Sequence, residues 1–145
     1  MSLAEEVDLL KRIPLFANIE TSKLKLLAFT SERVTYREGD VLFEQDMAGD
    51  SAYIIIEGSA DVLVNTPSGP KAVAQVTKND FVGEIAILCD VPRTATVRAA
   101  SDLTTLRINK ELFFRMISEF PQMAVEIMRV LAQRLEKTTK LALQN

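Results

Sequence analysis

Histidine and tryptophan are both missing from this 145-residue chain, and cysteine occurs once, as Cys89. Histidine is the usual general base of enzymes and the commonest metal ligand, so its absence removes Ser-His and Cys-His nucleophile pairs and His-based metal sites. Without a metal cluster or a nucleophile beside a base, the sequence offers no catalytic constellation. We therefore expect a protein that is not an enzyme and that carries no cofactor and no metal.

Disulfides and targeting segments are also missing. A single cysteine cannot form a disulfide within the chain, which is typical of a reducing compartment. No apolar run approaches the ~18 residues that a membrane span requires. The N-terminus carries acidic residues, Glu5 and Glu6, and no apolar signal-peptide region. These features predict a cytoplasmic protein with no membrane segment.

The chain has no large excess of either charge, since it contains 17 basic and 20 acidic residues and its net charge is −3. Bulk charge therefore does not indicate nucleic acid binding, and Lys137 and Lys140 near the C-terminus do not make a basic patch. We expect no nucleic acid partner for this chain alone. The hydrophobic content of 48% and the length fit one soluble domain, residues 1–145, with a substantial core.

The first 30 residues have helical periodicity. A short helix is predicted from residue 3 to residue 12, with Ser2 as its N-cap and Pro14 ending it. A second helix is predicted over 22–29. Helices this short are marginal alone, so both should dock on a larger element, with Leu15-Phe16 as a hydrophobic anchor.

Residues 31–109 change to an alternating pattern rich in β-branched residues, which is typical of strands. Glycines interrupt the pattern, and strands spaced by roughly 8–12 residues indicate an antiparallel barrel or sandwich. We expect residues 66–70 to form a hairpin loop. The predicted strands are 34–37, 41–44, 52–57, 60–64, 71–76, 94–99 and 103–108.

Residues 110–145 return to helical periodicity, with one helix ending near Pro121 and a longer one over 122–143. One apolar stripe on the long helix has the 4-3-4-3-4 spacing of a heptad seam, and we expect it to form a homodimer. The alternative is that the helix packs one broad face on its own domain. The seam consists of Ala124, Met128, Leu131, Leu135, Thr138 and Ala142, and a second stripe beside it of Met123, Ile127 and Val130.

Between the strands, residues 81–97 combine a short strand, a glycine turn, a short helix, a loop and a strand. Backbone N–H groups at a helix start attract anions, and Gly83 lets a ligand approach the backbone closely. Arg93 adds a planar, permanently charged guanidinium, whereas Glu84 would accept hydrogen bonds from neutral hydroxyls. Phosphate and hydroxyls together suggest a ribose phosphate. The plainer alternative is a turn, with Glu84 in the first helical turn and Arg93 on the surface.

This run resembles the phosphate-binding cassette of the cyclic nucleotide-binding domain family, which includes catabolite activator proteins, cyclic-nucleotide-dependent kinases and gated channels. The family pattern is an aromatic residue, a small residue, Gly-Glu, an apolar run, then Arg followed by Thr, Ser or Ala and a strand. Here these elements are Phe81, Gly83-Glu84, 85–88, Arg93-Thr94 and 95–97. The resemblance implies an α+β fold: an antiparallel, jelly-roll-like β-roll of eight strands, with short N-terminal helices and two C-terminal helices.

The resemblance also implies a ligand site for a cyclic nucleotide, with cAMP favoured and cGMP as the alternative. Arg93 and backbone N–H groups of the cassette would hold the phosphate, and Glu84 would accept from the ribose 2′-hydroxyl. The base would lie near Thr94 and the long C-terminal helix. The expected ligand-binding residues are Val82, Gly83, Glu84, Ile85, Ala86, Arg93, Thr94, Ala95, Thr138 and Thr139.

Thr138 and Thr139 are included because catabolite activator proteins contact the base with hydroxyls of the corresponding helix. The alternative interpretation is that both threonines are ordinary surface residues of a helix. Those proteins continue into a helix-turn-helix domain, and this sequence ends at Asn145 without one. The functional hypothesis is therefore a regulatory sensor module. The alternatives are the ligand-sensing part of a transcription regulator whose DNA-binding domain is absent from this chain, and an interaction protein with a vestigial pocket.

Overall fold

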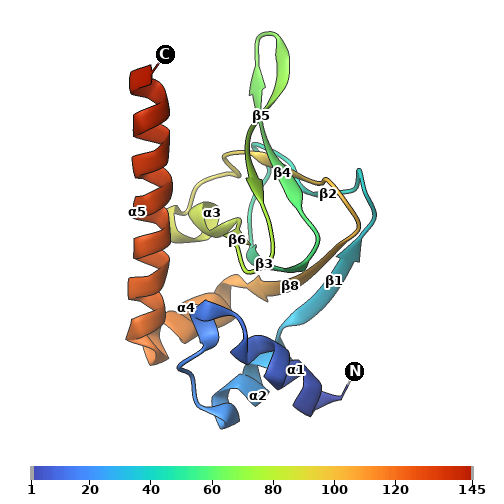
Figure 1. Cartoon of the computed structure of the whole chain (residues 1–145), viewed down its shortest axis with the longest axis vertical. Helices are drawn as coiled ribbons and strands as arrows, with labels where there is room; N and C mark the ends of the chain where they lie inside the picture. The colour runs from blue at the N-terminus through green and yellow to red at the C-terminus, as the bar shows by residue number, and fades with distance from the viewer. Residues whose placement is uncertain (1, 145) are drawn as a thin grey trace.

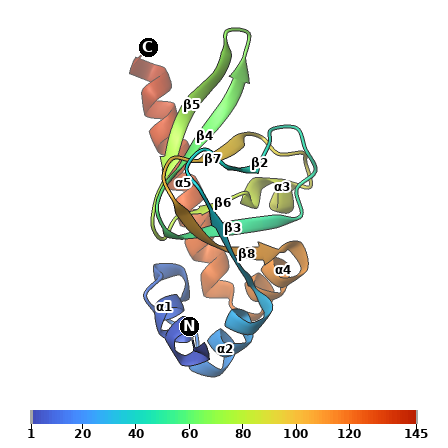
Figure 2. The ribbon, with the colours of Figure 1, turned by 90° about the vertical axis from the view of Figure 1, so that its right-hand side faces the viewer.

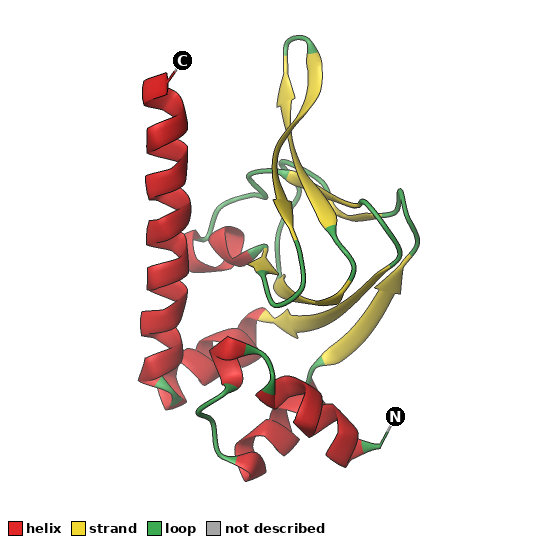
Figure 3. Cartoon of the chain, in the orientation of Figure 1, coloured by secondary structure: helices red, strands yellow, loops and turns green. Residues whose placement is uncertain are grey.

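The computed structural model describes residues 2–144 and consists of a β-roll with helices at one end and along one side (Figures 1 and 3). The helices are α1 (Leu3–Lys11), the 3-10 helix η1 (Pro14–Phe16), α2 (Thr21–Thr30), α3 (Glu84–Cys89), α4 (Lys110–Glu119) and α5 (Pro121–Gln144). The strands are β1 (Glu32–Tyr36), β2 (Val41–Phe43), β3 (Ser51–Glu57), β4 (Ala60–Thr66), β5 (Gly69–Val76), β6 (Phe81–Val82), β7 (Thr96–Ala99) and β8 (Leu103–Asn109).

The strands form two four-stranded antiparallel sheets, ordered β1-β8-β3-β6 and β2-β7-β4-β5. This architecture confirms the predicted α+β fold with an eight-stranded antiparallel roll and a long final helix. The helices also begin and end close to the predicted residues. Ser2 is the N-cap of α1, because its side chain accepts a hydrogen bond from the Glu5 backbone N–H.

Several predicted strand boundaries differ from the structure by one or two residues, among them the first strand, which runs from Glu32 to Tyr36. Two of the differences have a clear physical reason. The loop expected over 66–70 is shorter, because Thr66 pairs with Gly69 across the hairpin and donates its hydroxyl to the Gly69 carbonyl at 2.6 Å. The strand expected from residue 94 begins at Thr96. The backbone of Arg93 is bound to a different loop, since its N–H donates to Met47 and its carbonyl accepts from Asp46, both at 2.8 Å.

The core has two parts, separated by the central strand β3. Ile54 on one face of β3 packs among the helices, and Ile55 on the other face packs inside the roll. Both faces are covered, so β3 is buried over nearly its whole length. Phe16 is fully buried in the helical part, which confirms the predicted hydrophobic anchor. Figure 2 shows α1, α2 and α4 gathered at the end of the roll opposite the β4–β5 hairpin tip.

The apolar side chains of α5 that pack on its own domain lie in the first half of the helix. Met123 and Ile127 are buried and Val130 is partly buried, as predicted for the second stripe. Met128 and Leu135 of the heptad seam are 60% and 68% exposed. The distal half of α5 extends beside the β-roll (Figure 1). None of the helices within residues 2–144 is both long and apolar enough to span a membrane.

Candidate functional site

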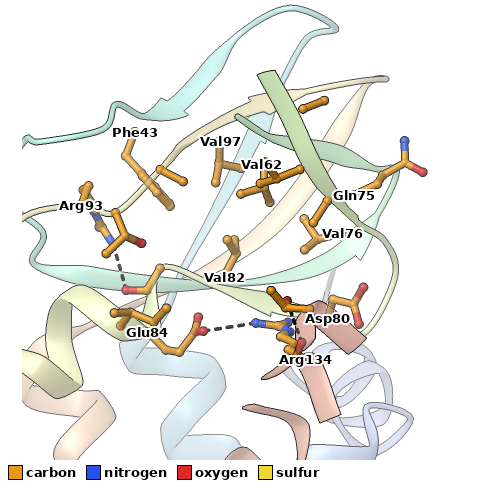
Figure 4. A pocket seen from close by; sticks show the side chains of 18 of the residues that line it. Phe43, Val62, Gln75, Val76, Asp80, Val82, Glu84, Arg93, Val97 and Arg134 are labelled. Carbon is orange, nitrogen blue, oxygen red and sulfur yellow. Dashed lines mark hydrogen bonds and ion pairs between the residues drawn. The ribbon is translucent and has the colours of Figure 1, made fainter. Parts of the chain in front are cut away.

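A cavity of about 650 Å³ lies between the cassette, the β4–β5 hairpin and α5. Figure 4 shows valines of the roll on one side of the cavity, Arg93 beside Phe43 at its left end, and Glu84 and Arg134 below the valines. The cavity therefore combines an apolar surface with a few charged groups, which is typical of small-molecule sites.

Gly83 turns the chain at the floor of this cavity. Its φ of +88° places it in the left-handed region at the N-cap of α3. A Cβ at this position would lie 2.7 Å from Nη1 of Arg93. The turn therefore requires glycine for both backbone conformation and space.

Arg93 is buried, with 3% of the residue exposed. Its Nη1 donates to the Gly83 carbonyl at 2.9 Å and its Nη2 to the Ser51 carbonyl at 2.8 Å. The guanidinium carbon lies 4.0 Å from the centre of the Phe43 ring. Burial lowers the pKa of Arg93 from its usual value. Nε is buried and has no hydrogen-bond partner, so its N–H is a free donor.

Glu84 is also buried, with 2% of the residue exposed. Its Oε1 accepts a hydrogen bond from Nη1 of Arg134 at 3.1 Å, whereas Oε2 is buried without a partner. Burial raises the pKa of this carboxyl, and the nearby Arg134 and Arg93 act in the opposite direction. The free Oε2 is an acceptor in a residue that lines the cavity.

Arg134 was not predicted as a site residue. Besides Glu84, it binds the Phe81 carbonyl through Nη2 at 2.6 Å, and its guanidinium carbon lies 4.7 Å from the centre of the Phe81 ring. The apolar stripe of Met123, Ile127 and Val130 has spacings of 4 and 3, and Arg134 is its next member at a spacing of 4. Helical periodicity could therefore have found this residue if charged side chains had been allowed on the stripe.

Most of the predicted site residues lie together around the cavity, and one does not. The cavity is lined by Val82, Gly83, Glu84, Ile85, Ala86, Arg93, Thr94, Ala95 and Thr138. Thr139 is not among the lining residues. The hydroxyls of Thr138 and Thr139 donate to the carbonyls of Arg134 and Leu135, each at 2.9 Å. Each threonine proton is thus bound within α5 in this structure.

The sequence prediction also missed the residues that approach the cassette from other elements. Phe43 of β2 stacks on Arg93, and Lys71 of β5 and Lys137 and Leu141 of α5 line the outer part of the cavity. Their contacts join segments far apart in the chain, so local sequence patterns carry no signal for them.

Residues 33–120 match the family model described as Cyclic nucleotide-binding domain. The chain belongs to the cyclic nucleotide-binding domain family. It is 33% identical over 109 residues to a cAMP-dependent protein kinase regulatory subunit of Blastocladiella emersonii, covering 74% of this chain and 27% of that protein. It is 26% identical over 132 residues to a CRP-like cAMP-activated global transcriptional regulator of Mycobacterium tuberculosis, covering 90% of this chain and 59% of that protein.

One similar solved structure, which the match covers almost completely, is the N-terminal domain of a transcriptional regulator from Streptomyces coelicolor. It has 31% sequence identity and a TM-score of 0.67, and covers 92% of this chain and 96% of that chain. The chain spans only 27% to 59% of the two curated relatives. The family to which it belongs is thus a ligand-sensing regulatory domain, found both in a kinase regulatory subunit and in transcriptional regulators.

Proposed function

We propose that this chain binds a cyclic nucleotide, with cAMP favoured over cGMP, as a cytoplasmic regulatory module. The observation that carries the proposal is a pair of buried, unpartnered polar atoms, Nε of Arg93 and Oε2 of Glu84. Leaving such an atom without a partner costs about 1–3 kcal/mol. One is a cationic donor and the other an anionic acceptor. A cyclic phosphate and a ribose hydroxyl complement them.

The phosphate fits at Arg93. Nε is free for an anionic oxygen, and the two carbonyl contacts and the Phe43 ring hold the guanidinium in place. Charge-assisted hydrogen bonds of this kind are about twice as strong as neutral ones. Backbone N–H groups at the start of α3, including those of Ile85 and Ala86, add further donors beside Gly83.

The ribose 2′-hydroxyl fits at Oε2 of Glu84. A ligand without that hydroxyl leaves the carboxylate oxygen unpaired, so the site should discriminate by about 1–3 kcal/mol. The base would then lie against Val62 and Val97 of the roll, facing Thr138 of α5. Thr94 next to Arg93 supplies a hydroxyl that suits either purine. Preference for cAMP is supported by the curated relatives, which are both named for cAMP.

A calorimetric titration of the chain with cAMP and cGMP tests the proposal. We expect binding at micromolar concentrations or tighter for at least one nucleotide, with cAMP the stronger. Adenosine, which lacks the phosphate, is the control ligand and should bind far more weakly. Absence of heat with both cyclic nucleotides would overturn the proposal.

A second part of the proposal is that two copies of the chain pair through α5. The exposed apolar residues Met128 and Leu135 lie seven residues apart on the predicted seam, and Leu131 between them is partly buried on the chain's own core. An exposed stripe of this spacing is the surface that a coiled-coil partner covers. A second copy presents the same stripe and is self-complementary in a twofold interface.

Leu135→Glu should convert the dimer to a monomer in sedimentation velocity. It places a carboxylate in an apolar seam, which costs about 3 kcal/mol or more and weakens pairing roughly 100-fold. Gln133→Glu is the matched control, because residue 133 is exposed and off the seam and the change adds the same charge. A dimer that persists in the Leu135 variant would place the interface elsewhere.

If the chain is part of a longer protein, its output is set by the other segments. The similarity to a CRP-like regulator supports a transcription regulator, whose DNA-binding domain would lie outside these residues. The similarity to a kinase regulatory subunit supports control of a catalytic partner. Binding of a cyclic nucleotide is common to both proposals.

A further inference from the structure

Ser51, the first residue of β3, is the point at which two arginines meet. Its carbonyl accepts a hydrogen bond from Nη2 of Arg93 at 2.8 Å, and its hydroxyl accepts one from Nε of Arg107 at 3.1 Å. Ser51 itself is completely buried. Arg107 is not among the residues that line the cavity. It therefore lies behind the candidate site, in contact with the residue that holds the Arg93 guanidinium.

The register of the first sheet brings Arg107 to this position. On β8 it lies opposite Glu32 of β1 and Tyr53 of β3, and side chains that lie opposite each other in an antiparallel pair share one face. Ser51 precedes Tyr53 by two residues, so its side chain is on the same face. Ile55, two residues after Tyr53, belongs to the apolar core inside the roll. Arg107 thus lies at the polar end of a face that leads into this core, where its guanidinium requires polar partners.

Arg107 uses all three of its guanidinium nitrogens. Besides the contact with Ser51, Nη1 donates to Glu32 at 3.2 Å and Nη2 to Asp50 at 3.3 Å. The Ser51 hydroxyl donates in turn to the same Asp50 oxygen at 3.0 Å, which closes a ring of three residues. The side chains of Glu32 and Asp50 are 64% and 80% exposed, so water screens both ion pairs. The hydrogen bond to the buried Ser51 is the contact of Arg107 that reaches the candidate site.

We propose that Arg107 is a positioning residue that orients Arg93 through Ser51, a proposal that rests on the cyclic nucleotide function above. Arg107 anchors the Ser51 side chain, and the anchored residue presents its carbonyl to Nη2 of Arg93. Arg107 thereby contributes to phosphate binding without contacting the ligand.

The position of Ser51 matters because the Arg93 guanidinium is planar. Its two carbonyl contacts, with Gly83 and Ser51, fix the plane and with it the direction of the Nε–H bond. A hydrogen bond weakens steeply as its angle departs from linear. If Ser51 shifts, the plane turns and the Nε–H bond points away from the phosphate oxygen. We expect this to reduce the affinity for cAMP by about three- to tenfold, the equivalent of one ordinary hydrogen bond.

Calorimetric titration with cAMP tests the proposal on four variants. Arg107→Gln removes the anchor and Ser51→Ala removes the hydroxyl that it holds, so each should lower the affinity by about three- to tenfold. The double variant should bind no more weakly than either single variant, because both changes interrupt the same chain of contacts. Glu32→Gln is the control, since it removes one ion pair of Arg107, leaves the Ser51 contact and should keep the wild-type affinity. Urea unfolding shows that each variant is folded at the assay temperature.

The NMR signal of the Arg93 Nε–H group reports the orientation of the guanidinium in the ligand-free proteins. The signal is assigned by its absence in Arg93→Lys. It should shift in Arg107→Gln and in Ser51→Ala, and it should stay at its wild-type position in Glu32→Gln.

Three results would overturn the proposal. The first is wild-type affinity in a folded Arg107→Gln variant. The second is that the losses of Arg107→Gln and Ser51→Ala add in the double variant, as they would if Arg107 acted only through its charge. The third is an unchanged Nε–H signal in both single variants. If the wild type binds neither cAMP nor cGMP, the proposed function is rejected, and the NMR signal still decides whether Arg107 orients Arg93.

Discussion

Arg93→Gln is expected to weaken cAMP binding by about 100-fold, because it removes the charged group that we propose binds the phosphate. Charge-assisted hydrogen bonds contribute about 1.5–3 kcal/mol each, and 1.4 kcal/mol corresponds to a tenfold change in affinity. Arg93→Lys keeps the positive charge but loses the planar guanidinium with its several N–H donors, so the affinity of this variant for cAMP should fall by about tenfold. Calorimetric titration of both variants measures the two effects.

The same substitutions also affect folding, since Arg93 donates to the carbonyls of Gly83 and Ser51. Each carbonyl left without its donor should lower the free energy of unfolding by about 1 kcal/mol. Urea unfolding therefore accompanies the titration, to show that the variants are folded at the assay temperature. Arg98→Gln is the control, because Arg98 is exposed on β7 and the change in charge is the same. Wild-type affinity in a folded Arg93→Gln variant would exclude Arg93 from the phosphate site.

Gly49→Ala is expected to damage the site from a segment outside the cassette. A Cβ on Gly49 would lie 2.7 Å from Nε of Arg93 and 2.7 Å from Cβ of Ala86. The added methyl group must displace the guanidinium or the start of α3. Overpacking of this kind typically costs about 1–3 kcal/mol of stability. Displacement of Nε, the atom that we propose binds the phosphate, should also reduce cAMP affinity by about tenfold or more, by the loss of one charged hydrogen bond.

Titration and urea unfolding together separate these two effects. Gly39→Ala is the control, because a Cβ on Gly39 has no atom within 4 Å. Its φ of +93° still makes alanine unfavourable there by about 1–2 kcal/mol, so stability should fall while affinity stays at the wild-type level. If Gly49→Ala binds cAMP as tightly as wild type does, the close approach of Gly49 to Arg93 has no importance for binding.

Much of the fold was predictable because its signals are local. Helical periodicity at both ends and alternation between them placed the elements near their observed positions, since burial of one face imposes the period of each element on its sequence. The hairpin after β4 was the clearest error. The turn-forming residues of 66–70 favoured a longer loop, but pairing of Thr66 with Gly69 extends both strands.

The candidate site also contains residues that the sequence could place and residues that it could not. Gly83, Glu84 and Arg93 belong to one continuous segment, so their spacing alone was enough to place them together. Phe43, Gly49 and Arg134 approach that segment from β2, the loop after it and α5. The sequence around Phe43 and Gly49 carries no mark of these contacts, because each contact depends on how distant elements pack. For Arg134, the sequence shows only that it continues the apolar stripe of the helix.

By itself, the sequence determined the elements, the family resemblance and the chemical types at the site: a glycine turn, a carboxylate and a guanidinium. Only the tertiary structure decided which of their atoms are already bound. Arg93 binds two carbonyls and keeps Nε free, and Glu84 binds Arg134 and keeps Oε2 free. The physical reason is that burial and hydrogen-bond pairing depend on neighbours from distant parts of the chain, which residue types and their spacing do not specify.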